Sequence, residues 1–280
     1  MSATVTSKAP KKAEDALKTR LLAGTSGWSY DFWAGTFYPP GTPPRDYLRL
    51  YSSVFDVVEV DSSFYRIPSR SMVAGWKRAT PEDFAFTAKF PRRITHELKL
   101  REIERPLDQF YTAFDELGSK LRAFVVQFPP SFKVEKDLPA LEEFLSLIRT
   151  DVPHALEFRH KSWFRDDVYD LLASHKATQA WSATQYLDSP PTVTSDMIYL
   201  RLIGDRSLKR LGELQKDRTE EMGRWGKRIN DSMQTVRQAY VFFNNHFAGF
   251  GPGSVNEFHR LVGLIEREFP QSGQKTLAEF

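Results

Sequence analysis

The chain has 280 residues, no cysteine and a formal net charge of +3 at pH 7. The lack of cysteine excludes disulfides, thiolate metal sites and a cysteine nucleophile, and the small charge differs from the basic stripe of a dedicated nucleic-acid binder. The apolar runs are far shorter than the roughly 20 residues of a membrane helix. Residues 1–20 carry Lys8, Lys11 and Lys12 with no apolar stretch after them, which predicts a disordered basic tail and no secretory signal.

Eight short segments alternate apolar and polar side chains with a period of two, which is typical of strands. In chain order the predicted strands are residues 21–28, 57–61, 84–91, 123–130, 154–160, 177–183, 197–204 and 238–246. The sixth is the weakest, and residues 186–194 after it contain prolines and show no helical period.

Helical spacing of apolar residues follows most of these strands. We expect Ser69 to cap a short helix, Asp137 to cap another, and Ser254 to open the last helix as part of a capping box. Eight strands alternating with about eight helical stretches predict a (β/α)8 TIM barrel. It forms a single domain over residues 21–270, with a C-terminal tail at residues 271–280.

Side chains alternate between the two faces of a strand, and this alternation, which we call strand parity, assigns a face to each polar residue. Val58 and Val60 share one face of their strand, while Glu59 and Asp61 share the other. Because helices cover the outside of a barrel, the polar set points inward. It comprises Glu59, Asp61, Lys89, Gln127, Glu157, Arg159, Arg201 and Asn244. Three acids balance three bases, as buried charges require, and a self-satisfied ion-pair network is the alternative to a working site.

The predicted site lies at the C-terminal ends of the strands, where barrels place their chemistry. The catalytic candidates are Glu59, Asp61, Glu157, His96 and His160. The substrate-binding candidates are Tyr65, Arg66, Lys89, Gln127, Arg159, Trp163, Arg201, Asn244, Asn245 and His246. Arginine and lysine would neutralise charge, a carboxylate would transfer the proton, and Tyr65 or Trp163 would stack on the substrate.

The same residues also suggest two other kinds of site, a metal site and a glycosidase site. The histidines at 96, 160 and 246 could bind a divalent metal with a glutamate, but they lack a His-x-x-x-His spacing, so no metal is predicted and the cofactor is left open. A glycosidase would use Glu59 and Glu157 as its carboxylate pair. The nearby cations would keep both of these acids ionised, which disfavours that reading.

Two glycine-containing loops favour an anionic ligand instead. Barrels often hold a phosphate in the loops after their last two strands, and here these loops are residues 204–207 and 247–254. The second loop leads into a helix N-terminus, whose free N–H groups favour negative charge. Together with Arg66, Lys89, Arg201 and Arg206 near the same mouth, these loops predict anion binding.

Many sequence blocks resemble the YecE-like family, domain of unknown function 72. They are residues 24–28 (GTSGW), 58–68 (VEVDSSFYRIP), 89–91 (KFP), 94–96 (ITH), 127–130 (QFPP), 157–160 (EFRH), 199–202 (YLRL) and 243–246 (FNNH). The resemblance implies a TIM barrel with no settled activity, and structural analogy within the family suggests a phosphodiester site like that of barrel endonucleases. Members commonly carry an Asp after the sixth strand and Arg-Leu-His-Gly after the seventh, whereas this chain has residues 181–184 (WSAT) and 201–204 (RLIG). Both departures disfavour a metal-dependent mechanism.

Two functional hypotheses follow. The first is an enzyme that binds, and as a phosphodiester or phosphate-ester hydrolase cleaves, an anionic small molecule or nucleic-acid-like substrate at the barrel mouth. The second is a non-catalytic binding module whose interior charges serve as scaffold. For either, we expect a cytoplasmic location, no membrane contact and no obligate protein partner.

Overall fold

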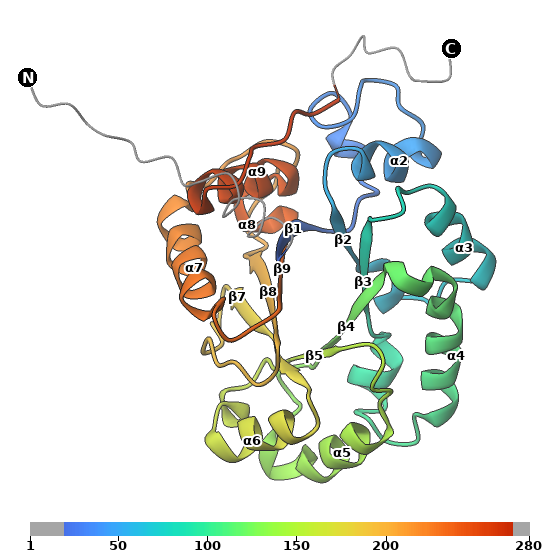
Figure 1. The fold of residues 1–280 in the computed structure, drawn as a ribbon, viewed down its shortest axis with the longest axis vertical. Coiled ribbons are helices and arrows are strands. Elements are labelled where there is room, and N and C mark those ends of the chain that lie inside the picture. Colours follow the sequence, from blue (N-terminus) through green and yellow to red (C-terminus); the bar gives the residue numbers. More distant parts are fainter. Residues whose placement is uncertain (1–19, 271–280) are drawn as a thin grey trace, which may run out of the picture.

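Nine parallel strands form one sheet that curves into a barrel, and helices surround its outer face (Figure 1). The computed structural model describes residues 20–270, so the predicted tail segments at residues 1–19 and 271–280 lie outside the described part. The strands are β1 (Leu21–Ser26), β2 (Val57–Val60), β3 (Ala85–Lys89), β4 (Leu121–Gln127), β5 (His154–Glu157), β6 (Thr178–Gln179), β7 (Trp181–Thr184), β8 (Met197–Gly204) and β9 (Gln238–Phe243). The predicted TIM barrel is confirmed.

The predicted sixth strand is split in two, which explains why nine strands replace the expected eight. β6 pairs with β5, whereas β7 pairs with β8. Ala180 lies between them and donates its N–H to the carbonyl of Leu156 at 2.9 Å. The sheet order is therefore β6-β5-β4-β3-β2-β1-β9-β8-β7, and the chain itself joins the two ends of the sheet through Ala180.

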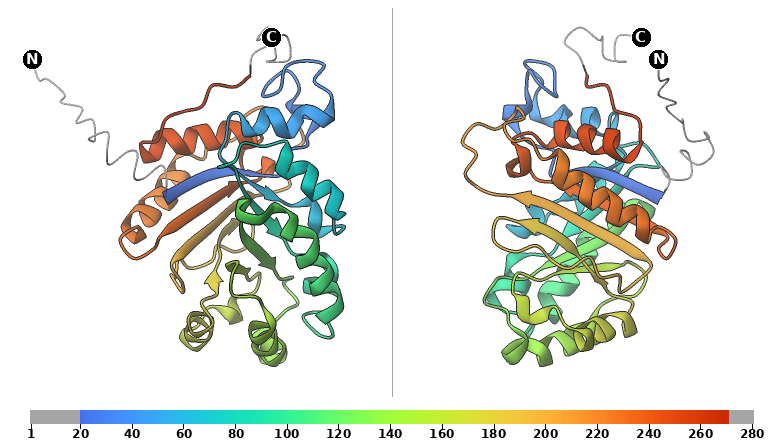
Figure 2. Two further views of the ribbon diagram at one scale, coloured as in Figure 1. Left: turned by 45° about the vertical axis from the view of Figure 1, so that its right-hand side comes forward. Right: turned by 90° about the vertical axis from the view of Figure 1, so that its left-hand side faces the viewer.

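Helices follow most of the strands and lie outside them. They are α2 (Tyr47–Ser52), α3 (Arg70–Arg78), α4 (Glu104–Phe114), α5 (Val134–Leu147), α6 (Asp166–Ser174), α7 (Thr219–Ser232), α8 (Asn245–Ala248) and α9 (Gly251–Val262). Seen from the side, α7 (orange) and α9 (red) lie together against the outer face near β1 (Figure 2). Residues 185–196 are irregular, as expected. Within residues 20–270, no helix is long and apolar enough to cross a bilayer.

The helix starts agree only partly with the predicted caps. Ser69 caps α3, since its side chain accepts a hydrogen bond from the N–H of Met72. The prediction for Asp137 was wrong by one turn, because α5 begins at Val134 and Asp137 reaches back to accept from the N–H of Lys133 at 2.9 Å. Asp137 thus satisfies a free N–H at the start of the helix, as a capping side chain does, but from a position inside the first turn.

The predicted capping box at Ser254 was also wrong. α9 already begins at Gly251, so Ser254 lies inside the helix and its hydroxyl donates to the carbonyl of Phe250. The side chain of Asn245 supplies the missing acceptor, because its Oδ1 accepts from the N–H of Gly251 at 3.0 Å. A residue six positions upstream therefore takes the capping role.

Two separate apolar clusters confirm the strand parity. Val58 and Val60 belong to the large cluster between the sheet and the helices. A smaller cluster fills the interior of the barrel and includes Val57, Ala85, Val125, Tyr199 and Phe242. Because the polar residues of the same inward faces lie toward the strand ends, the interior changes from apolar to charged as it approaches the C-terminal mouth.

Candidate functional site

A buried arginine organises the charged end of the barrel. Arg201 of β8 binds Glu59 of β2 through two hydrogen bonds, Nη2 to Oε1 at 2.7 Å and Nε to Oε2 at 2.9 Å. Its Nη1 donates to Oε2 of Glu157 on β5 at 2.5 Å. Arg201 is 3% exposed and both glutamates are 0% exposed. One guanidinium therefore joins carboxylates from two distant strands across the barrel.

Further groups complete this network. Arg159 forms an ion pair with the remaining oxygen of Glu157. The hydroxyl of Tyr199 donates to Oε2 of Glu59 at 2.8 Å, and because its proton is used there, it accepts from the hydroxyl of Thr87 at 2.8 Å. We call Arg201, Arg159, Glu59 and Glu157 the ion network. Its two positive and two negative charges cancel.

Strand register makes room for the network. In the parallel pairing, Ser182 of β7 lies beside Arg201 and Ser26 of β1 lies beside Glu59. Both serines are buried. Neighbours in register share a face, so these short side chains leave interior volume for the guanidinium.

The network favours the ionised form of Glu157. Burial raises the pKa of Glu157, but Arg159 and Arg201 more than offset that effect and lower the pKa below its ordinary value. Burial also lowers the pKa of Arg201, while Glu59 and Glu157 raise it well above the usual range. A carboxylate held in this way accepts hydrogen bonds and is poorly suited to exchange a proton with a substrate.

A pocket of about 650 Å³ opens above the network at the C-terminal mouth. Its cationic lining residues are Lys89, Arg92, Arg159, Arg201 and Arg206. Asp61 is the carboxylate among the lining residues that the structure describes. Since the ion network is neutral, Lys89, Arg92 and Arg206 face Asp61 with an excess of positive charge. Arg92 is partly offset by an exposed ion pair with Glu97 at 3.8 Å.

The pKa values of Lys89 and His96, two groups in the pocket wall, are both lowered. Burial, with the charge of Arg201, lowers the pKa of Lys89 to about 8. Its Nζ lies 4.0 Å from the centre of the Phe64 ring. Burial, with the charges of Lys89 and Arg92, lowers the pKa of His96 to about 4, so this imidazole is neutral at pH 7.

Asp61 differs from the two glutamates beneath it. Burial and the negative charge of Glu59 raise its pKa, although Lys89 and Arg201 oppose the effect. Its Oδ2 lies 3.4 Å from the hydroxyl of Tyr30. Because Asp61 lines the pocket and has a raised pKa, it is the carboxyl group of this site best suited to transfer a proton.

The structure brings together eight of the predicted site residues in the wall of the pocket. They are Asp61, Tyr65, Lys89, His96, Gln127, Arg159, Arg201 and Asn244. Glu59 and Glu157 lie beneath this wall in the ion network, fully buried. The side chain of Tyr65 is 80% exposed at the rim.

The other predicted residues do not line the pocket. Trp163 is 0% exposed and is stacked between Phe132 and Phe158, with ring centres 5.0 and 4.8 Å away, so no face of the indole remains for a ligand. His160 uses Nδ1 to bind the hydroxyl of Ser162 at 2.8 Å. Trp163 therefore has no accessible face with which to stack on a substrate, the role that the sequence led us to expect.

Of the three remaining residues, Asn245 and His246 lie in α8 and Arg66 lies in an adjoining pocket. Asn245 is buried, and its Oδ1 also accepts from the indole N–H of Trp33 at 3.0 Å. His246 is the second residue of the short α8, and its backbone N–H donates to Oδ1 of Asn244 at 3.0 Å. Since Asn245 already occupies the N–H of Gly251, the N-terminus of α9 is not the open phosphate cradle that the sequence suggested.

Arg66 lines an adjoining pocket of about 660 Å³. The two pockets share Phe64, Tyr65 and Arg92. The arginines of the adjoining pocket are Arg66, Arg92, Arg93 and Arg105, accompanied by Glu97. The positive surface therefore continues past Tyr65.

Sequence reasoning missed several residues of the site. Arg92 follows the third strand after Pro91, and nothing in its local pattern distinguishes it from a surface arginine. Tyr199 alternates with apolar neighbours on the inward face of β8, so parity places it inside, but only the coordinates show its hydrogen bond to Glu59. The ring of Phe64, in the turn after β2, lies under the amine of Lys89 at the end of β3, a contact that spacing does not reveal.

The histidines do not converge. Among residues 20–270, no three histidine, aspartate or glutamate side chains lie close enough together to hold a metal ion. His96 lines the pocket, whereas His160 and His246 lie outside it.

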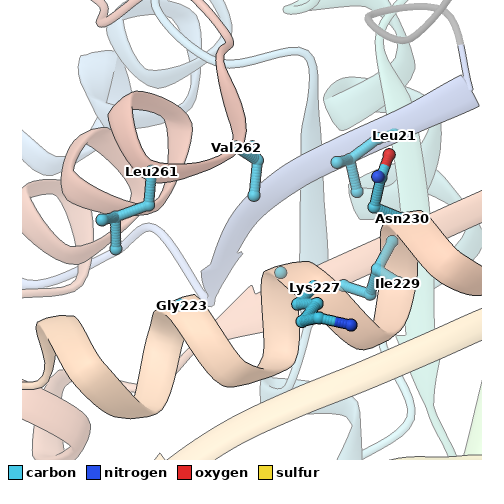
Figure 3. A pocket seen from close by; sticks show the side chains of 8 residues that line it. Leu21, Gly223, Lys227, Ile229, Asn230, Leu261 and Val262 are labelled. Atoms are coloured by element: carbon cyan, nitrogen blue, oxygen red, sulfur yellow. The ribbon is translucent and has the colours of Figure 1, made fainter.

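Another cavity, of about 340 Å³, lies between α7 and α9 near the start of β1. Leu261 and Val262 of α9 lie across it from Gly223 and Lys227 of α7 (Figure 3). Leu21 begins β1, so this cavity lies toward the N-terminal end of the strand, opposite the charged mouth. Lys227 is the charged residue of this lining, whereas several charged side chains converge in the mouth pocket, which makes the mouth pocket the better candidate site.

Comparison with known proteins identifies relatives along nearly the whole chain. The family described as "Protein of unknown function DUF72" matches residues 22–277. The UPF0759 protein YunF of Bacillus subtilis is 28% identical over 278 residues, which cover 89% of this chain and 96% of YunF. The UPF0759 protein YecE of Escherichia coli is 31% identical over 171 residues, which cover 61% of this chain and 60% of YecE.

Solved structures agree with the fold. A DUF72 family protein from Thermotoga maritima superposes with a TM-score of 0.73 at 28% identity, over 87% of this chain and 99% of that one. A DUF72 family protein from Enterococcus faecalis gives a TM-score of 0.72 at 22% identity, over 92% and 99% of the two chains, a likeness that shows the fold alone. The chain therefore belongs to the DUF72 family.

Proposed function

We propose that the mouth pocket binds a phosphate-bearing anion. The observation that carries this proposal is the surplus of cations in its wall, where Lys89, Arg92 and Arg206 face Asp61 above a neutral ion network. A concave wall of one charge sign concentrates ligands of the opposite sign. Arginine donors suit the tetrahedral oxygens of a phosphate, and the pocket volume accommodates a small phosphate ester.

The binding test is calorimetric titration with inorganic phosphate at low ionic strength. Substituting Arg206→Gln removes a cation of the wall and is expected to weaken binding by about tenfold, or 1.4 kcal/mol. Arg210→Gln is the matched control, because Arg210 is 82% exposed, pairs with Glu213 at 3.7 Å and is not among the residues of the pocket wall. Equal losses in the two variants, or no heat with the wild type, would contradict the proposal.

The finer proposal is that the bound phosphate ester is hydrolysed. Asp61 is the group that accepts a proton from the attacking water, because it lines the pocket and its pKa is raised, whereas the buried glutamates are committed to Arg201. Neutral His96 supplies a second proton-transfer group in the same wall. The cations stabilise the charge that develops on the phosphoryl oxygens.

Turnover of p-nitrophenyl phosphate and bis-p-nitrophenyl phosphate tests this step. Asp61→Asn should lower kcat by about a hundredfold, the lower end of what general acid–base catalysis contributes, while phosphate binding persists. Asp167→Asn is the control, since that carboxylate is 55% exposed and pairs with Arg165. Wild-type turnover that survives Asp61→Asn unchanged would exclude this role.

A non-catalytic binding module remains the second candidate, and the closed ion network favours it. Every charge in that network has a partner among its own members, as a structural scaffold requires. Phosphate binding without turnover of either ester would select this function over hydrolysis.

The adjoining pocket extends the proposal to longer ligands. It continues the row of arginines, and Tyr65 stands exposed between the two pockets. An exposed ring between cationic grooves suits a strand of nucleotides, whose bases stack on aromatic side chains. Fluorescence anisotropy with a labelled single-stranded oligonucleotide tests this extension. Tyr65→Ser should weaken oligonucleotide binding by about tenfold, roughly one stacked base, and leave phosphate binding unchanged.

A further inference from the structure

The amine of Lys89 occupies an unusual position in the site. It lies at the end of β3, in the wall of the mouth pocket, and its Nζ lies over the face of the Phe64 ring, 4.0 Å from the ring centre. Within residues 20–270, no carboxylate forms an ion pair with it, because Glu59 and Glu157 are taken by arginines. A lysine that only balanced charge would be expected to pair with one of these acids.

We propose that Lys89 is a nucleophilic amine that forms an imine with a phosphate-bearing aldehyde or ketone bound in the mouth pocket. The proposal rests on the phosphate-binding function proposed above and names the class of ligand for that site. Arg92 and Arg206 would hold the phosphate, and the carbonyl carbon would lie at the amine. A desolvated lysine beside other cations is a recognised way to activate an amine.

The chemistry balances without an oxidant or reductant. The neutral amine attacks the carbonyl carbon, a C–N bond forms, and the carbonyl oxygen takes up a proton to give a carbinolamine. The hydroxyl then takes up a second proton from solvent, the C–O bond breaks and the oxygen leaves as water, so one proton is consumed and one water is released for each protonated imine. Asp61, in the same wall, is placed to carry the protons between nitrogen and oxygen.

The surroundings of the amine come from four parts of the barrel. The charged and titratable groups that act on it are Glu59, Asp61, His96, Glu157, Arg159 and Arg201. Arg201 and Arg159 disfavour the ammonium form and the glutamates favour it, yet burial is the largest influence, so the pKa of Lys89 falls to about 8. The reactive neutral form is therefore well populated just above neutral pH.

The experiment uses pyridoxal 5′-phosphate as a phosphate-bearing aldehyde and pyridoxal as the same aldehyde without phosphate. The full-length protein is incubated with each at pH 7.5, the imine is trapped with cyanoborohydride, and the modified lysines are mapped by peptide mass spectrometry. We expect selective modification of Lys89, about tenfold slower with pyridoxal, which lacks the phosphate contact. Inorganic phosphate should slow the reaction with pyridoxal 5′-phosphate.

Variants and mapping separate the outcomes. Lys89→Arg should abolish the selective adduct, whereas Lys227→Arg should leave it intact, because Lys227 is 78% exposed on α7 and pairs with Asp231. Site mapping on the wild type decides the matter even if Lys89→Arg fails to fold. Modification spread over surface lysines, with Lys89 unmodified, would overturn the imine proposal. If phosphate still binds in the calorimetric titration, the proposed phosphate-binding function would stand even then. Equal rates with both aldehydes would overturn the phosphate-bearing class of ligand.

Discussion

Arg201 shows how one residue makes a charged barrel interior stable. Taking a carboxylate out of water is expensive unless a partner of opposite charge and good geometry compensates. Arg201 offers three donors to Glu59 and Glu157 at 2.5 to 2.9 Å, and the planar guanidinium fits Glu59 with a pair of bonds. A lysine could not reproduce this bridge between two strands.

Arg201→Leu should therefore destabilise the protein by about 3–5 kcal/mol, because it leaves buried carboxylates unpaired. Urea unfolding followed by circular dichroism measures the loss. Arg210→Leu, at an 82% exposed position, should leave the midpoint nearly unchanged. A loss for Arg201→Leu as small as that of the control would mean that the network does not hold the barrel interior together.

Lys89 gives the anion affinity of the pocket a pH dependence with a definite sign. Its amine is cationic below a pKa of about 8 and neutral above it, so attraction for an anion falls as pH rises. Sulfate is a suitable probe, since its own charge is constant from pH 6.5 to 9.5. We expect its affinity to fall about tenfold across this range, as measured by calorimetric titration.

The control for this pH profile is Lys89→Gln, which should bind sulfate weakly at pH 6.5 and show no further decline. His96, with a pKa of about 4, stays neutral throughout and does not contribute. A wild-type affinity that is constant or rises with pH would contradict the assigned role of Lys89.

At the scale of elements, the sheet of the barrel is interrupted between β6 and β7. Here hydroxyl side chains replace backbone hydrogen bonds between strands. Thr194 accepts from the N–H of Gln179 at 2.8 Å and donates to the carbonyl of Ala177 at 2.8 Å. Ser189 accepts from the N–H of Ser182 at 2.7 Å. The irregular residues 185–196 thus close the gap in the sheet.

Thr194→Val keeps the shape of the side chain but removes both bonds. It should destabilise the protein by about 1–3 kcal/mol, because a buried N–H is left unsatisfied, and should speed amide exchange at Gln179. Urea unfolding and hydrogen exchange measure these effects. Thr235→Val is the control, since its hydroxyl donates to the carbonyl of Ser232 at an exposed site. Exchange at Gln179 that stays as slow as in the wild type would contradict this account.

For the whole molecule, periodicity and parity predicted the barrel and the inward set of charges. This alternation is local, because adjacent residues of a strand point to opposite faces. The side chains of Glu59 and Val60 therefore lie on opposite faces of the sheet, independently of the rest of the chain. The break at Ala180 was not predicted, because it depends on which neighbour each half of the strand pairs with. The caps of α5 and α9 were misplaced for a similar reason, since partners outside the expected window satisfy them.

The candidate site was less predictable than the fold. The alternation of faces along a strand predicts that a side chain points into the barrel. It does not predict the position of that side chain along the barrel axis or the residues that it contacts. The sequence therefore could not show that Glu59 and Glu157 lie buried beneath Arg201 while Asp61 reaches the pocket. Residues on loops, such as Trp163 and Arg92, have no periodicity to place them.

The central claim is that the mouth of the barrel binds a tetrahedral oxyanion. Its most direct test is an anomalous difference map from a crystal soaked in tungstate, a heavy analogue of phosphate. We predict the strongest peak in the mouth pocket, within hydrogen-bonding distance of Lys89, Arg92 or Arg206. Strong peaks elsewhere on the surface, with the mouth pocket empty, would contradict it.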